Sequence, residues 1–246
     1  MRRIRRSTQL EDLWIVLADS VYGRLRLSMM RAELVPHQRL KVRDLAKQMG
    51  TSETPVREAL LQLAREGAVE VRPRFFIRVP RLTLADYKDI RDIRLELEPM
   101  AAERAMSRLA PADIERLHAV HLRLIDAERR RDWRTALEAN RDFHFGMFDR
   151  AGMPALVHVL EGLWTRVGPM LSQLYPAAPP TYGDGHQHLA ILDALRRRDP
   201  YGLRMAIRLD LIEGGRGLLR RIAEQEAQDA TDALSAPMSH GALSIN

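Results

Sequence analysis

The stretch RLKVRDLAKQMGTSETPVREALLQLAREGAVEVRPRFFIRV, residues 39–79, decides the fold of the first third of the chain. Apolar residues recur at three- and four-residue steps on both sides of Gly50, as they do on the buried face of a helix. Gly50 suits a helix C-cap, and Pro55 suits the first turn of a second helix capped by Ser52 or Thr54. Two helices joined by a short turn with glycine predict a helix-turn-helix.

The two predicted helices each have one apolar stripe, and a β-hairpin follows them. The stripes are Val42, Leu45, Ala46 and Met49 in the first helix, and Val56, Leu60, Leu61 and Leu63 in the second. After Gly67, residues 69–71 and 77–79 are predicted to be short strands, with a basic hairpin tip between them. A hairpin in this place is a wing, so the segment predicts a DNA-binding element.

Composition limits the other classes of protein. The 246 residues fit one large or two ordinary domains, and no apolar run approaches the roughly 20 residues of a membrane span. The basic start MRRIRRS has no apolar stretch behind it, so it is not a signal peptide. The chain has no cysteine, which excludes disulfides and thiolate metal sites. We therefore expect a cytoplasmic protein that does not enter a membrane.

Charge is distributed unevenly along the chain. Residues 1–80 hold 16 Lys and Arg against 9 Asp and Glu, whereas residues 81–246 hold 23 against 24. A basic first third joined to a near-neutral remainder is the pattern expected of one nucleic-acid-binding domain attached to a domain of another kind.

The start of the second helix supplies the predicted base contacts, because these positions face away from the apolar stripe and reach the major groove. Arg57 can pair with a guanine edge, and Glu53 can accept from a cytosine amino group. A salt bridge between these two side chains is the alternative. Wing arginines contact phosphate or the minor groove. The predicted DNA contacts of helix and wing are Ser52, Glu53, Thr54, Arg57, Arg72 and Arg74.

The motifs PVREAL at 55–60 and LAREG at 63–67, with the basic wing, resemble the winged helix-turn-helix of GntR-type bacterial transcription regulators. The resemblance covers residues 21–79. It implies a transcription regulator that binds double-stranded DNA, and it implies that Arg43, ahead of the turn, contacts DNA.

Three positions depart from the pattern of that family. The family has Arg where this chain has Glu53, and it has Gly where this chain has His37 and Arg74. The change at Glu53 bears on base preference, and the change at Arg74 bears on the tight turn of the wing.

The rest of the chain is predicted to be helical. We expect a basic arm at 1–8, the winged helix-turn-helix at 9–79 with a first helix over 9–32, a linker at 80–83, a helical domain at 84–227 and a disordered tail at 228–246. Thr83 and Asp86 predict a capping box. The predicted helices are 84–108, 111–131, 133–150, 153–175, 186–198 and 200–227. The fold class is therefore mainly α: a winged helix-turn-helix followed by an antiparallel bundle of about six helices.

Three segments of the helical part resemble the FadR-like branch of the GntR family, which has an all-helical FCD domain. They are DIRLELEPMAAERA at 92–105, DFHFGMFDRAG at 142–152 and HLAILDAL at 188–195. The resemblance implies a domain that binds an effector and forms a homodimer, so that two DNA-binding units meet a palindromic operator.

Polar side chains interrupt the apolar faces of three predicted helices. They are Asn140 and His144 in 133–150, His188 in 186–198 and Asp210 in 200–227. A buried carboxylate needs a partner, and two imidazoles, an amide oxygen and a carboxylate would suit a metal ion that accepts N and O ligands. The alternative is a metal-free polar cluster that holds an effector by hydrogen bonds.

The FCD resemblance implies the same four positions. Many FCD domains bind a divalent metal through Asp, a His four residues later, a second His 44 further on and a third 22 beyond; here these are Asn140, His144, His188 and Asp210. Two of the four residue types differ. Zinc is the first choice, with nickel or manganese as alternatives.

The resemblance also implies that Arg94 takes a carboxylate of a small effector, and the alternative for Arg94 is a salt bridge with Glu98. Four further residues are candidates for the wall of the same cavity, whereas His118 and His121 are predicted to lie at the surface. The wall candidates are Trp164, Arg166, Tyr175 and His186, and His186 is also an alternative ligand to His188.

These features predict a ligand-responsive transcription factor that acts as a repressor. A metal-dependent enzyme attached to a DNA-binding unit is one alternative, although the chain has no general base at fixed spacing and no nucleophile motif. An architectural DNA-binding protein, whose helical bundle serves only dimerisation, is the other.

Overall fold

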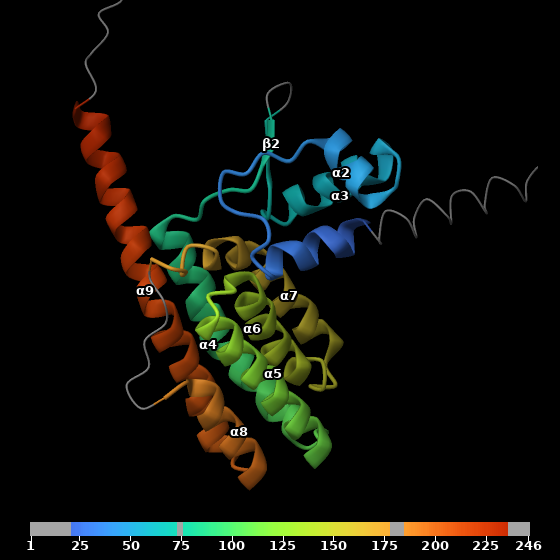
Figure 1. The fold of residues 1–246 in the computed structure, drawn as a ribbon, viewed down its shortest axis with the longest axis vertical. Helices are drawn as coiled ribbons and strands as arrows, with labels where there is room; N and C mark the ends of the chain where they lie inside the picture. Colours follow the sequence, from blue (N-terminus) through green and yellow to red (C-terminus); the bar gives the residue numbers. More distant parts are fainter. Residues whose placement is uncertain (1–20, 73–75, 178–184, 236–246) are drawn as a thin grey trace, which may run out of the picture.

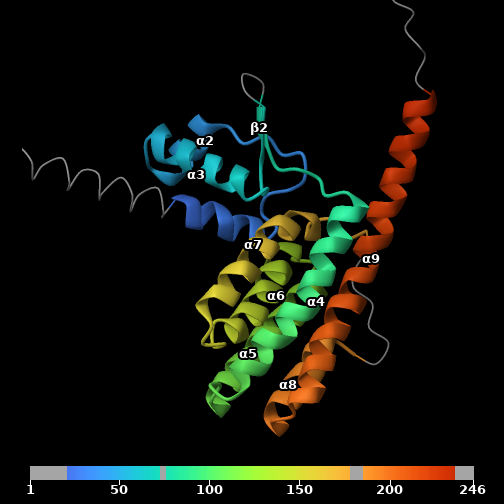
Figure 2. The same ribbon diagram turned by 180° about the vertical axis from the view of Figure 1, so that it is seen from behind.

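A small DNA-binding unit lies at one end of a helical bundle in the computed structural model, which describes residues 21–72, 76–177 and 185–235 (Figure 1). The bundle helices lie side by side along one direction, and α9 extends past the bundle beside the small unit (Figure 2). Among the described residues, the structure has no helix that is long and apolar enough to cross a membrane. This mainly α architecture confirms the predicted fold class.

The N-terminal unit is a winged helix-turn-helix. A first helix, described over 21–30, precedes α2 (Val42–Met49) and α3 (Glu53–Arg65). Gly50 ends α2 in the left-handed conformation, at φ 67°, which confirms the predicted C-cap. Ser52 stands at the N-cap position of α3 with an extended backbone, but its side chain makes no capping hydrogen bond. Strands β1 (Glu70–Arg72) and β2 (Phe76–Arg78) pair antiparallel and form the wing. The wing tip, with Arg74, lies outside the described residues.

The core of this unit forms where α2 and α3 meet the first helix. It buries Leu45 and Ala46 of α2 and Val56, Leu60 and Leu63 of α3, while Val42 and Met49 are partly buried. The prediction that Leu61 belongs to this stripe is wrong, because its side chain is 43% exposed. Each helical residue turns the chain by about 100°, so Leu61 lies to one side of the face that Leu60 and Leu63 share.

Helices α4 to α9 form the bundle: α4 (Leu84–Met106), α5 (Pro111–Arg129), α6 (Trp133–Phe148), α7 (Pro154–Leu171), α8 (Gln187–Arg197) and α9 (Pro200–Ser235). Helix α4 packs on α6, α7 and α9, while α5 packs on α6 and α8. The predicted capping box is present: Thr83 Oγ1 accepts from the amide of Asp86 at 3.1 Å, and Asp86 Oδ2 accepts from the amide of Thr83 at 3.2 Å.

Helix α9 continues through Ser235, so the predicted end at 227 is wrong, as is the predicted disorder over 228–235. The segment continues from AEQEAQ at residues 223–228, which consists only of the strong helix formers Ala, Glu and Gln. Its neighbours also hold it: Glu226 accepts from the amide of Leu84 at 2.7 Å, and Asp229 pairs with Arg81. The tail from 236 onward lies outside the described residues.

The first helix joins the DNA-binding unit to the bundle by packing on α7. A Cβ atom on Gly168 would lie 2.2 Å from the backbone oxygen of Met29, so the two helix backbones touch at this point. Arg26, which is 9% exposed, donates to Thr165 Oγ1 at 3.3 Å and pairs with Glu161 at 3.2 Å. The two units are therefore coupled through packed helices as well as through the linker.

Candidate functional site

The predicted base-reading residues lie on the outer face of the helix-turn-helix. Ser52, Glu53, Thr54, Arg57 and Arg43 are all exposed. Arg57 Nη2 lies 3.2 Å from Glu53 Oε2, so the salt bridge weighed above is present, but the side chains are 60% and 49% exposed. An ion pair this open to water contributes little and leaves Arg57 able to turn toward a base.

In the wing, Glu70 lies between two arginines. Its carboxylate accepts from Arg78 Nε at 2.7 Å and from Arg72 Nε at 2.8 Å, and these bonds, Arg78 first, lower the pKa of Glu70. The Arg78 guanidinium also lies 4.7 Å from the ring centre of Phe76, with Arg39 at 5.8 Å. The wing arginines are thus fixed by an acid and an aromatic ring before any DNA is bound.

A groove of about 490 Å³ runs between α2, α3 and the wing. The exposed side chain of Leu61 lines this groove. The charged residues along the groove are all cations, namely Arg39, Lys41, Arg57 and Arg72. Such a groove attracts a phosphate backbone.

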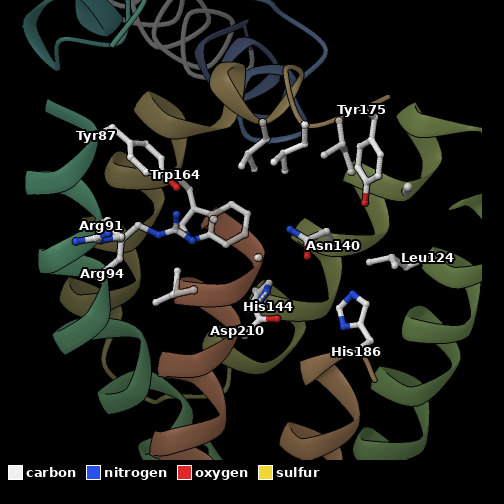
Figure 3. A pocket seen from close by; sticks show the side chains of 17 residues that line it. Tyr87, Arg91, Arg94, Leu124, Asn140, His144, Trp164, Tyr175, His186 and Asp210 are labelled. Atoms are coloured by element: carbon white, nitrogen blue, oxygen red, sulfur yellow. Dashed lines mark ion pairs between the residues drawn. The ribbon is translucent and has the colours of Figure 1, made fainter. Parts of the chain in front are cut away.

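The bundle encloses a smaller cavity of about 70 Å³, lined by residues from α4, α5, α6, α7 and α9 and by His186 (Figure 3). In Figure 3, Arg94 and Trp164 lie on one side of the cavity and His186 on the other. The predicted residues that line it are Arg94, Asn140, His144, Asp210, Trp164, Tyr175 and His186. Arg166 does not line it; its Nε lies 3.7 Å from where a Cβ of Gly67 would be, at the DNA-binding unit.

Three of the four predicted metal ligands converge, and two of them, His144 and Asp210, line this cavity. His144 Nε2 lies 3.2 Å from Asp210 Oδ2, and His188 Nε2 lies 4.0 Å from Asp210 Oδ1. One ligand atom from each of the three lies within 4.8 Å of the others, and all three residues are buried. Asn140, one turn before His144 on α6, lines the same cavity and is half-buried. The structure thus brings together side chains from α6, α8 and α9.

The ring nitrogens of this group are short of partners. His144 Nδ1 and both nitrogens of His188 are buried without a hydrogen bond. The His188 ring stacks on Phe143 at 3.7 Å, and burial holds the pKa of His188 well below its usual value. An uncharged imidazole with a free lone pair is the form that binds a metal. The donor set therefore fits a divalent ion of N/O preference.

Arg94 forms the salt bridge with Glu98 that was weighed for it, and its side chain also lines the cavity. Its Nε donates to Glu98 Oε1 at 2.6 Å, and its guanidinium lies 4.5 Å from the ring centre of Trp164 while lining the cavity. Trp164 Nε1 donates to the same Glu98 oxygen at 2.7 Å. Glu98 is fully buried, so this carboxylate orients both the arginine and the tryptophan.

The prediction that His121 lies at the surface is wrong, because it is 3% exposed and packs edge-on against His186 and His188. The sequence held the signal: His121 is four residues after Leu117 and three before Leu124, on the buried stripe of α5. Glu98 gave a weaker signal, since sequence shows the possible pair with Arg94 but not the burial of the pair.

Two family models match the chain. Residues 17–79 match the "Bacterial regulatory proteins, gntR family" model, and residues 89–213 match the "FCD domain" model. The chain is also 36% identical to the HTH-type transcriptional regulator McbR of Escherichia coli over 193 residues, which cover 77% of this chain and 87% of McbR. The chain belongs to the GntR family of transcription regulators. Its DNA-binding unit is followed along the chain by an FCD domain.

Two further likenesses agree with this assignment. The solved structure of Escherichia coli McbR/YncC superposes with a TM-score of 0.73 at 32% identity, covering 87% of this chain and 98% of that one. The HTH-type transcriptional repressor RspR of Escherichia coli is 26% identical over 184 residues, 74% of this chain and 79% of RspR. The matched families and relatives are transcription regulators, so the enzyme alternative is rejected.

Proposed function

We propose that this GntR-family regulator is a repressor that releases its operator when a small carboxylate metabolite enters the FCD cavity. The observation that carries the proposal is the cavity itself, which combines a cation, Arg94, with His144, His186 and Asp210. An architectural DNA-binding protein would not need such a cavity. The repressor relative RspR supports the sign of regulation.

The effector is small, because a cavity of about 70 Å³ admits only a few water-sized groups. Arg94 Nε is held by Glu98, so the terminal nitrogens of the guanidinium would receive the carboxylate in a charge-assisted hydrogen bond. The tryptophan that shares Glu98 would close one side of the site. The proposed ligand class is therefore a short-chain carboxylic acid.

A divalent metal ion would be held by His144, His188 and Asp210, with the weaker oxygen of Asn140 beside them. Their spacing and the unpartnered nitrogens support this site. Zinc fits two imidazoles and a carboxylate, and nickel or manganese are the alternatives. When bound, the ion would attract the effector's anionic group. Metal analysis of untagged protein tests this point, and protein without stoichiometric metal would show the cluster to be a metal-free polar site.

Helix α7 would carry the signal from the cavity to the DNA-binding unit. Trp164 lines the cavity, and its neighbour Thr165 accepts from Arg26 of the first helix at 3.3 Å. An effector that shifts Trp164 would move the contact that positions the first helix. The resulting population shift would favour arrangements whose reading helices do not match the operator.

The regulator would act as a homodimer in the bacterial cytoplasm, on a palindromic operator with one half-site for each subunit. An exposed apolar stripe on α9 supports a second copy as the partner, because these side chains share one face and are open to water. The stripe is Tyr201, Met205, Leu209 and Ile212. Sedimentation of the Met205→Glu variant tests this: a monomer is expected, and an unchanged dimer would place the interface elsewhere.

Selection of bound duplexes from a random DNA library, followed by a screen of carboxylic acids on the selected DNA, tests the whole proposal. We expect a two-fold symmetric site and at least one acid that weakens binding. The Arg26→Ala variant should still bind the DNA but should lose the response to that acid, because its link to α7 is gone. DNA affinity that no carboxylic acid changes would contradict ligand-responsive repression.

A further inference from the structure

A second group of histidines lies next to the proposed metal ligands. It comprises His121 on α5, His186 at the N-cap of α8 and His188 in the first turn of α8. One ring nitrogen from each lies within 4.8 Å of the others. The group contains no carboxylate, and it shares only His188 with the group formed by His144 and Asp210.

The burial of these rings points to a ligand. His121 is 3% exposed and its Nδ1 has no hydrogen-bond partner; His188 is fully buried and neither of its nitrogens has one. Buried polar atoms without partners are unfavourable, so these nitrogens need a ligand that the protein itself does not supply. Edge-on packing, with ring centres 5.1 Å apart for His121 and His186 and 5.5 Å apart for His121 and His188, explains the ring positions but leaves Nδ1 of His121 and both nitrogens of His188 unpaired.

The access route also suits a cation. His186 lines the cavity, so an ion in the cavity reaches this group without unfolding the bundle. Helices α5 and α8 pack on each other and hold the donors in place.

We propose that His121, His186 and His188 form a nitrogen-only site for a divalent transition ion, separate from the one at His144 and Asp210. Three imidazoles bind Zn²⁺, Ni²⁺ or Cu²⁺ and leave a position for water or an anionic ligand, whereas Mg²⁺ and Mn²⁺ prefer oxygen. His188 can serve either site through the ring nitrogen that carries no proton, and it can bridge both only as an imidazolate, after its ring proton has passed to water. The site goes beyond the proposed function, which requires only His144, His188 and Asp210.

Zn²⁺ binding to the full-length, untagged and chelator-stripped protein tests the proposal. The His144→Gln/Asp210→Asn variant removes the family's site and is expected to keep one Zn²⁺ per subunit. Adding His121→Leu should weaken that remaining affinity by at least about tenfold. His118→Gln is the matched control, because His118 lies on the same helix, half-buried and 6.5 Å from the His121 ring, outside the group.

The outcomes separate this site from the proposed function. If the double variant binds no Zn²⁺ while the wild type does, the three-histidine site is wrong and the family's site stands. If the double variant binds Zn²⁺ as tightly with His121→Leu as without it, the three-histidine site is also wrong. Should the double variant not fold by circular dichroism, Co²⁺ spectra of wild type and His121→Leu replace it: a changed visible band supports the site, and identical spectra overturn it.

Discussion

The DNA-binding unit and the FCD domain place their functional residues in opposite ways. In the first, Arg43, Glu53 and Arg57 are exposed and come from one short stretch of sequence. In the second, Arg94 and Asp210 are buried, and they come from opposite ends of the domain's sequence, although they line the same cavity. A surface site tolerates loss of a side chain without loss of fold, whereas a buried site ties binding to packing. Substitutions should therefore separate DNA affinity from stability in the first unit and not in the second.

The largest effect is expected on DNA affinity. Changing Arg57 and Arg72 together to Ala should weaken binding to the selected operator by about 10- to 100-fold, because a base contact is worth about 1–3 kcal/mol and a phosphate contact adds to it. Binding measured at several salt concentrations should also show a shallower dependence on salt. The melting temperature should not change, since both side chains are exposed.

The matched control is Arg197→Ala on α8, whose exposed side chain pairs with Asp193 at 2.8 Å in the FCD domain. It should leave operator affinity and its salt dependence unchanged. If the double variant behaved like this control, the groove beside α3 would not be the DNA-binding surface.

The next effect is on stability, at the contact between the two units. Gly168→Ala should lower the free energy of unfolding by about 1–3 kcal/mol, because its Cβ would lie 2.2 Å from the backbone oxygen of Met29 and the helices must separate. Gly162→Ala on the same helix has open space and should stabilise by up to about 1 kcal/mol. Denaturant unfolding of both variants gives the comparison; equal values would mean that the first helix does not rest on α7.

The same contrast explains what the sequence could predict. In the DNA-binding unit, the helix ends, the turn and the exposed base-reading face follow from local rules. Gly50 and Ser52 mark helix boundaries through backbone conformations that depend only on residues a few positions away. Leu61 was assigned to the wrong face because the spacing of apolar residues does not show how wide the buried face of a helix is. The contact of the first helix with α7 has no local signature, because a glycine such as Gly168 shows its role only when a second backbone lies against it.

In the FCD domain, spacing indicated which polar residues face inward but not how they pair. His144 and Asp210 were expected in one cluster, and the structure places them 3.2 Å apart. Helix periodicity is enough to place His121 on the buried stripe of α5, whereas the burial of Glu98 and its sharing by Arg94 and Trp164 depend on how α4 and α7 pack.

A smaller gain of stability is expected at a position where the DNA-binding unit departs from the pattern of its family. His37 stands where the family resemblance implies a glycine, and it has φ 66°, a left-handed conformation that strains a residue with a side chain. His37→Gly should therefore raise the free energy of unfolding by about 0.5–1 kcal/mol, after the greater freedom of glycine in the unfolded chain is deducted. Thermal unfolding measures it, and Gly50→Ala, at φ 67°, should shift stability in the opposite direction. A loss of stability in His37→Gly would show that the imidazole makes a contact worth more than the strain.

The smallest effect concerns the wing, where an acid holds the cations. Glu70→Gln keeps the size of the side chain but removes the charge that pairs with Arg72 and Arg78 at 2.8 and 2.7 Å. The released arginines should raise affinity for any duplex by about two- to threefold and steepen its dependence on salt, because phosphate contacts do not read sequence. Preference for the operator over random DNA should stay the same, since Arg57 is untouched. If the variant instead lost affinity, Glu70 would be needed to orient the wing arginines. The exposed DNA-binding surface would then depend on side chains held in place beforehand, as the buried cavity does.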